Sequence, residues 1–194
     1  MSIAHHDEHE PRDGSGAIGD EDPRAAIDPA ETSLIAAPLD FLYAEHLRQR
    51  QLAKILTLIA DGLINRRTIS AVIAFIKTDL AQHILDEEIS FFPFLRPLCH
   101  SEDNVDAILN LLAEEHRADE SESETMIATL EIMAKGGEPG DAARASVRDF
   151  ADRLRHHLAL ENGVLLPLAR ARMTRDALRL VAQSMAARRG GVRS

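Results

Sequence analysis

The sequence of 194 residues has no tryptophan, a single tyrosine and a single cysteine. One cysteine, Cys99, excludes an intrachain disulfide and any metal site built from several cysteines. The shortage of aromatic rings leaves little on which nucleic-acid bases would stack. Basic residues are also outnumbered, 22 against 32 acidic ones. The resulting net charge of -10 argues against a nucleic-acid backbone or an anionic membrane as the main partner, because both attract basic surfaces.

Long apolar runs are missing as well. No stretch approaches the roughly 18 consecutive apolar residues of a membrane-spanning helix. Residues 1–20 are polar and acidic and do not resemble a signal peptide. We therefore expect a cytoplasmic protein that does not enter a membrane.

The charge divides the chain into three parts. Residues 1–32 hold nine acids and two bases and show no apolar period, which predicts a disordered acidic tail. Residues 33–170 carry the regular apolar spacing of a folded unit. Residues 171–194 predict a C-terminal helix and a basic tail, since from residue 170 onwards there are seven arginines and one acid.

Apolar residues recur at helical spacing through most of residues 33–194, and no alternating pattern supports a strand. Proline and glycine mark the ends of the helices, for example Pro38 in a first turn and Pro93 near an end. The expected helices span residues 38–62, 68–92, 102–135, 141–166 and 174–187. Four long helices with short connections predict an all-α fold, an up-down-up-down antiparallel four-helix bundle with an extra C-terminal helix.

An internal repeat runs through the four long helices. In the second helix, a glutamate follows His83 by four residues and a proline follows it by ten, and the same spacing begins at His157 in the fourth. The first and third helices each carry one histidine after a glutamate, His46 and His116. The lone histidines are 70 residues apart and the paired ones 74, which indicates a duplicated structural unit.

This repeat favours a metal site. Residues four apart share one face of a helix, so Glu87 lies beside His83 and Glu161 beside His157. Any single pair of this kind is more often a surface ion pair, but six residues on four helices form a duplicated set. Burying them without a counter-charge would be costly, and a pair of metal ions removes that cost. Nitrogen and oxygen donors suit iron, zinc or manganese, and two carboxylates can bridge two ions.

Ferritin-like bundles bind two metals through Glu-x-x-His motifs. No carboxylate stands three residues before any of the four histidines, so this template does not fit. Those positions hold Tyr43, Leu80, Ala113 and Leu154.

The pattern instead resembles the hemerythrin-like, or HHE cation-binding, family over residues 38–170. The resemblance implies a four-helix bundle around two non-haem iron ions, bridged by two glutamates and an oxo or hydroxo group; zinc or manganese is the alternative metal. The implied ligands are His46, His83, Glu87, His116, His157 and Glu161.

Two departures from the family's oxygen carriers bear on function. Glu120 stands where those proteins have an additional histidine, and Asn162 where they have an aspartate. The ligand set is similar to that of hemerythrin-like proteins of nitric oxide and peroxide stress, iron-sulfur repair or iron sensing. The repair proteins usually carry a cysteine-bearing N-terminal segment, which this sequence does not show.

The sequence allows two interpretations for some residues near the motifs. Glu120 is a seventh ligand or a solvated acid, and Tyr43 donates a hydrogen bond at the site or is a core aromatic. Asp86 and Glu88 are expected outside the ligand set, either behind the ligands or on the surface. The neighbouring His156 points away from the face of His157. The tail histidines His5, His6 and His9 are expected to be disordered rather than ligands.

Two functions follow from the same six residues. One is a diiron redox protein that acts on oxygen, nitric oxide or peroxide. The other is a non-catalytic iron-binding or sensing module that signals to a protein partner. The sequence alone leaves open whether the protein is an enzyme.

Overall fold

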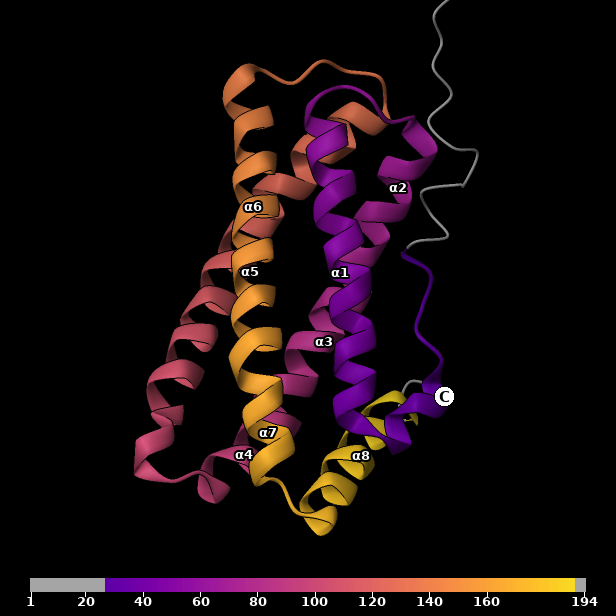
Figure 1. The fold of residues 1–194 in the computed structure, drawn as a ribbon. Coiled ribbons are helices and arrows are strands. Elements are labelled where there is room, and N and C mark those ends of the chain that lie inside the picture. The colour runs from indigo at the N-terminus through magenta and orange to yellow at the C-terminus, as the bar shows by residue number, and fades with distance from the viewer. Residues whose placement is uncertain (1–26, 191–194) are drawn as a thin grey trace, which may run out of the picture.

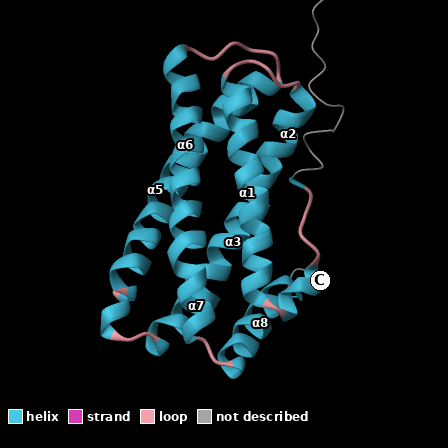
Figure 2. Cartoon of the chain, viewed as in Figure 1, coloured by secondary structure: helices cyan, strands magenta, loops and turns pink. Residues whose placement is uncertain are grey.

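The structure is a computed structural model that describes residues 27–190 (Figure 1). Within these residues every regular element is a helix and none is a strand, as Figure 2 shows. The predicted all-α class is therefore confirmed. Most of the predicted acidic tail, with His5, His6 and His9, and the last residues of the basic tail, 191–194, lie outside the described residues.

The first long helix, α1, spans Pro38–Ala60 and follows a short 3-10 helix, η2, at Thr32–Ala36. Pro38 occupies the first turn, where its missing N–H costs no hydrogen bond. Gly62 follows the end of α1 with φ of 76°, a left-handed conformation that glycine adopts without steric cost. Both ends agree with the prediction.

The second long segment is helical from Arg66 to Leu98 but is not a uniform α-helix. Asn65 caps it by accepting a hydrogen bond from the Thr68 amide at 3.0 Å. Its turns change type five times along the way, in this order: α2 (Arg66–Phe75), the π-helical η3 (Ile76–Leu80), α3 (Ala81–Leu85), the π-helical η4 (Asp86–Phe91), α4 (Phe92–Leu95) and the 3-10 helix η5 (Arg96–Leu98).

The third and fourth long segments follow after a 3-10 turn, η6, at Ser101–Asp103. Helix α5 spans Val105–Ala134; it starts three residues later than predicted because Asn104 adopts a left-handed φ of 49°. The fourth segment consists of α6 (Asp141–Leu160), the π-helical η7 (Glu161–Leu165) and α7 (Leu166–Arg172).

The prediction that the second long helix ends at Pro93 is wrong, because the helix continues through the proline. At Pro167, where the sequence left either an end or a kink open, the fourth helix also continues. A proline inside an α-helix lacks an N–H and clashes with the carbonyl four residues earlier. Here a wider π turn precedes each one. The amide of Phe92 donates to the Glu87 carbonyl and that of Leu166 to the Glu161 carbonyl, five residues back in each case.

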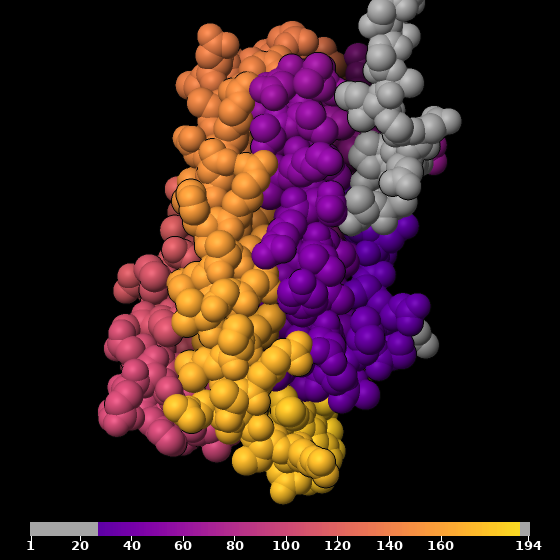
Figure 3. All heavy atoms as spheres, in the orientation of Figure 1, coloured from indigo at the N-terminus to yellow at the C-terminus, as the bar shows by residue number. Residues whose placement is uncertain are grey.

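The four long segments lie side by side (Figure 1). The α1–α2 and α5–α6 connections are at one end, and the α4–α5 and α7–α8 connections are at the other. Helix α8 (Arg175–Gly190) crosses this second end, where it packs against α1, η4 and α4. Figure 3 shows α8, in yellow, covering that end of the molecule beside α1.

The apolar core has two clusters. One contains Leu52, Val72, Leu130 and Phe150, and the other contains Leu42, Phe91, Leu109, Leu165 and Val181. On each long segment, the predicted ligands fall between residues of the first cluster and residues of the second. The apolar packing therefore encloses the polar site from both ends.

One helical stretch is long and apolar enough to be considered as a possible membrane-spanning helix. Arg66–Leu98 is 33 residues long and has an 18-residue window with a mean hydropathy of 1.2, so by length and composition it could cross a membrane, although it contains no run of 18 consecutive apolar residues. One such helix is weak support for a membrane, because the core helix of a soluble protein passes the same test. The stretch also contains His83 and Glu87, which are both buried.

We predict that Leu52→Ala lowers the free energy of unfolding of the metal-free protein by about 2–5 kcal/mol, because Leu52 is fully buried and its removal leaves a cavity. Urea unfolding followed by circular dichroism measures the change. Leu63→Ala is the control, since that side chain is 68% exposed and should change stability by less than about 0.5 kcal/mol. Equal effects of the two substitutions would contradict the assigned core.

Candidate metal centre

Six side chains from the four long segments meet between the two apolar clusters. Each is at most 6% exposed, and both glutamates are fully buried. They are the six residues that the sequence pattern singled out: His46 on α1, His83 on α3, Glu87 on η4, His116 on α5, His157 on α6 and Glu161 on η7.

The six residues form two groups that share both glutamates. In each group, one candidate ligand atom per residue lies within 4.8 Å of the others. His46 and His83 make up the first group with the glutamates. His46 Nε2 lies 3.3 Å from Glu161 Oε2 and 3.5 Å from Glu87 Oε1, and His83 Nε2 lies 3.5 Å from the same Glu87 oxygen.

The second group uses the opposite oxygens of the same carboxylates. His116 Nε2 lies 3.5 Å from Glu87 Oε2, and His157 Nε2 lies 3.2 Å from Glu161 Oε1. The two Nε2 atoms are 3.2 Å apart. Each glutamate therefore presents one oxygen to each histidine pair, as two carboxylates that bridge two cations would have to do.

Most of the converging atoms have no hydrogen-bond partner in the part of the chain that the structure describes. They are His46 Nε2, both ring nitrogens of His83, and all four carboxylate oxygens of Glu87 and Glu161. Buried polar atoms are almost always paired, because an unpaired one keeps the full cost of its lost hydration. Metal cations would satisfy these nitrogens and oxygens together, so the donor set fits a pair of ions.

Hydrogen bonds behind three histidines aim their Nε2 atoms at the centre. His116 Nδ1 donates to Glu88 Oε1 at 2.9 Å, and His157 Nδ1 donates to Glu115 Oε2 at 2.8 Å. His46 Nδ1 lies 3.0 Å from Asn162 Oδ1, whose own amide nitrogen donates to the Leu158 carbonyl. Such bonds fix the proton on Nδ1 and leave the Nε2 lone pair for a metal.

The duplication extends to some of these supporting contacts. Glu88 and Asn162 each follow a glutamate of the site, and each accepts from a lone histidine of the repeat. Sequence reasoning placed Glu88 only outside the ligand set and assigned no contact to Asn162. Glu88 and Asn162 occupy the same position in the repeat, directly after a glutamate of the site, and this shared position could have indicated that they have the same role.

One supporting contact is not duplicated. Glu115 precedes His116, and its counterpart in the first half is Glu45, which precedes His46. Glu45 instead accepts hydrogen bonds from Arg48, at 2.7 and 3.0 Å. The Nδ1 atom of His83 is consequently without a partner among the described residues.

Burial and mutual charge shift the pKa values of the metal-free site. Burial and the nearby His46 hold the pKa of His83 well below its usual value. Burial and the Glu161 charge raise the pKa of Glu87. Burial also opposes a charge on His157, but Glu161 and Glu87 outweigh it and raise its pKa to about 10. For Glu161, the attraction of His46 and His157 overcomes burial and lowers the pKa.

Two further residues proposed from the sequence do not join these groups. Glu120 is exposed on α5, and Tyr43 is 43% exposed on α1. His156, expected to point away from the site, is exposed. Asp86 is fully buried but faces α8, where it pairs with Arg189.

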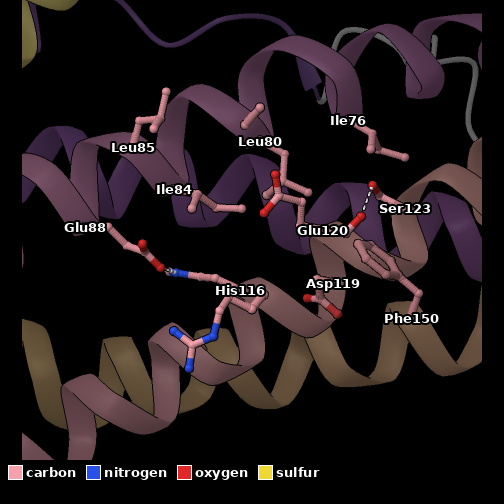
Figure 4. A pocket seen from close by; sticks show the side chains of 12 residues that line it. Ile76, Leu80, Ile84, Leu85, Glu88, His116, Asp119, Glu120, Ser123 and Phe150 are labelled. Carbon is pink, nitrogen blue, oxygen red and sulfur yellow. Dashed lines mark hydrogen bonds and ion pairs between the residues drawn. The ribbon is translucent and has the colours of Figure 1, made fainter.

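A cavity of about 290 Å³ borders the centre on the side of His116 (Figure 4). Glu88 and His116, joined by their hydrogen bond, stand at one side of it, and Glu120 and Phe150 line another part. Its other walls are mainly apolar: Ile76, Leu80, Ile84 and Leu85. Of the six residues, His116 lines this cavity.

We predict that metal binding at pH 7 releases at least one proton per chain, because the pKa of about 10 keeps His157 protonated in the metal-free protein and a metal ligand must lose that proton. Because protons compete with the metal below this pKa, the apparent affinity should rise with pH. An indicator dye in weakly buffered solution during a Zn(II) titration measures the release. Saturation without acidification would contradict the assigned protonation.

Comparison with known proteins identifies the fold that carries this site. No match was found among curated proteins. A family model described as hemerythrin HHE cation binding domain matches residues 37–169, which is more than half of the chain and includes all six buried residues. The match agrees with the resemblance seen in the sequence over residues 38–170. The chain belongs to the hemerythrin HHE cation-binding domain family.

Proposed function

We propose that the six buried residues hold two iron ions and that the protein reacts with peroxide, nitric oxide or oxygen at this centre. The observation that carries the proposal is the sharing of Glu87 and Glu161 between two histidine pairs. If each histidine pair held one ion and both carboxylates bridged the two ions, all four unpartnered carboxylate oxygens of Glu87 and Glu161 would be bound.

Iron is preferred to zinc for this centre because it supplies redox chemistry as well as charge, and to manganese because imidazole nitrogens suit iron better. Each group offers two imidazole nitrogens and two carboxylate oxygens. This mixed donor set suits iron, and four protein ligands leave coordination positions for a small molecule and for an oxo or hydroxo bridge.

The surrounding residues have separate tasks in this proposal. The acceptors Glu88, Glu115 and Asn162 orient the imidazoles. The two apolar clusters keep bulk water from the carboxylates, which strengthens their hold on a cation. The cavity beside His116 admits a small ligand, and its volume of about 290 Å³ exceeds that of a diatomic molecule or peroxide.

We further infer that the four long segments form an up-down-up-down bundle spanning residues 33–170, with residues 171–194 as an appended helix and basic tail. The placement of successive connections at alternate ends supports this topology. We also propose a cytoplasmic protein whose partners are small molecules and, for signalling, another protein rather than nucleic acid or a membrane. The net charge of -10 supports this choice of partners.

A second candidate function is a non-catalytic iron sensor. The observation that favours it is the bonding of α8 to η4, the segment that carries Glu87. In this case the bound metal changes a surface that a protein partner reads.

We predict that the protein purified after anaerobic Fe(II) loading contains two iron ions per chain and that His157→Ala removes at least one of them, because His157 supplies one of only two imidazoles in its group. Elemental analysis and the visible spectrum of the oxidised protein measure this. His156→Ala is the matched control, since its side chain is exposed beside His157. Less than one iron per chain in the wild type would overturn the diiron proposal.

We predict that the iron-loaded protein consumes hydrogen peroxide or nitric oxide and that Glu161→Ala abolishes the activity, since this removes an oxygen from both groups. Amperometric electrodes record the loss of either molecule. His156→Ala should leave the rate unchanged. Full iron content without consumption, combined with iron-dependent capture of a partner, would replace the redox function with the sensor.

A further inference from the structure

Helix α8 lies outside residues 37–169, which the family model matches, yet it is firmly packed. Val181 and Met185 are fully buried in the second apolar cluster. The last turns of α8 then bring two arginines against η4, the π turn that contains Glu87. The contacts that follow lie beyond what the family match covers.

Arg189 makes the first contact, with the carboxylate that precedes Glu87. Its Nη1 donates to Asp86 Oδ1 at 3.0 Å, and its Nη2 donates to Asp86 Oδ2. Asp86 is fully buried, so Arg189 supplies the counter-charge that makes this burial tolerable. The guanidinium also lies 4.8 Å from the ring centroid of Phe41 on α1, which ties α8 to a second segment.

Arg188 makes the second contact, on the other side of Glu87 in the sequence. Its Nη2 donates to the Ser90 hydroxyl at 2.6 Å and to the Leu85 carbonyl at 3.1 Å. Ser90 is fully buried and also bonds to the hydroxyl of Ser184 on α8, at 2.8 Å. The polar groups before and after Glu87 are therefore held by α8.

The two glutamates of the centre differ in this respect. At Glu161, the neighbouring Asn162 bonds to the Leu158 carbonyl and to His46, so residues within the bundle hold that π turn. At Glu87, the neighbouring Glu88 likewise accepts from His116 within the bundle, and α8 adds bonds on both flanks of Glu87. The turn that carries Glu87 is therefore held by a helix appended to the four-helix unit in addition to residues of the bundle.

We propose that α8 positions Glu87 through Arg188 and Arg189, and that docking of α8 is thermodynamically coupled to metal binding. This inference rests on the proposed metal function. Because coupling is reciprocal, an α8 that raises the metal affinity must itself dock more firmly when metal is bound. Loss of metal then loosens the C-terminal helix, which gives the molecule a surface that depends on its metal content.

An ordinary surface ion pair would not have this effect, since such pairs contribute little to stability. Three features separate the α8 contacts from that case. Asp86 and Ser90 are fully buried, both lie within three residues of Glu87, and Arg188 bonds to backbone as well as to side chain. Arg179 on the same helix provides the contrast, because among residues 27–190 its ion pair is with the exposed Asp176.

The test uses the full chain and the double variant Arg188→Gln/Arg189→Gln, with Arg179→Gln as the matched control. A competing chelator measures the Fe(II) affinity of each protein under anaerobic conditions. We expect the double variant to bind about tenfold more weakly, within the usual range of coupling effects, and the control to match the wild type. A double variant with wild-type affinity and metal release rate would overturn the proposal.

Hydrogen exchange gives a second readout that needs no variant. In the wild type, the amides of residues 181–190 should exchange about tenfold more slowly with metal bound than without it. Exchange that is independent of metal in a protein holding two ions would overturn the coupling and leave the proposed function intact. If the wild type binds no metal, the proposed function itself fails and this inference falls with it.

If the double variant does not fold, Ser184→Ala removes a single α8 contact with η4 and tests the same coupling by affinity and exchange. A measurable loss of affinity, smaller than that expected for the double variant, supports the proposal. An unchanged affinity together with unchanged exchange of α8 would overturn it.

Discussion

The molecule is organised around two carboxylates that are enclosed between apolar clusters and have no hydrogen-bond partner among the described residues. Glu87 and Glu161 are fully buried, and their oxygens face four imidazoles. In an interior of low polarity such charges demand a cation or a proton. The raised pKa of Glu87 means that, without a metal, this carboxylate binds a proton more readily than an exposed glutamate does. The hydrogen bonds at the histidine Nδ1 atoms orient the imidazoles toward these two carboxylates, and the two apolar clusters enclose them.

The spacing of the repeat has a backbone explanation as well as a ligand one. A histidine and a glutamate four residues apart share a helix face, and the proline six residues after the glutamate requires a wider turn ahead of it. In both halves this turn carries the glutamate, whose own carbonyl accepts the π-type hydrogen bond. Wide turns of this kind are frequent at functional sites, where they redirect a side chain without ending the helix. The proline therefore belongs to the motif as much as the ligands do.

The helices and the convergence of the six candidate ligands could be predicted from the sequence, because both follow from the periodic spacing of residues along the chain. The sequence was not sufficient to predict the passage of the helices through Pro93 and Pro167, since proline alone permits either an end or a bend. Glu115 behind His157 and Arg189 behind Asp86 also escaped prediction. These pairs are 42 and 103 residues apart, and their contact depends on how each helix is rotated about its axis. That rotation is decided by the packing of the whole core.

The diversion of Glu45 to Arg48 has a consequence for the symmetry of the centre. The repeat distributes the candidate ligands evenly, two imidazoles to each group. The supporting contacts are not distributed evenly, because three imidazoles have an acceptor behind them and His83 has none among the described residues. An imidazole without such an acceptor is a weaker electron donor. The two histidine pairs are therefore chemically unequal: both imidazoles of one pair have an acceptor behind them, and one imidazole of the other pair has none among the described residues.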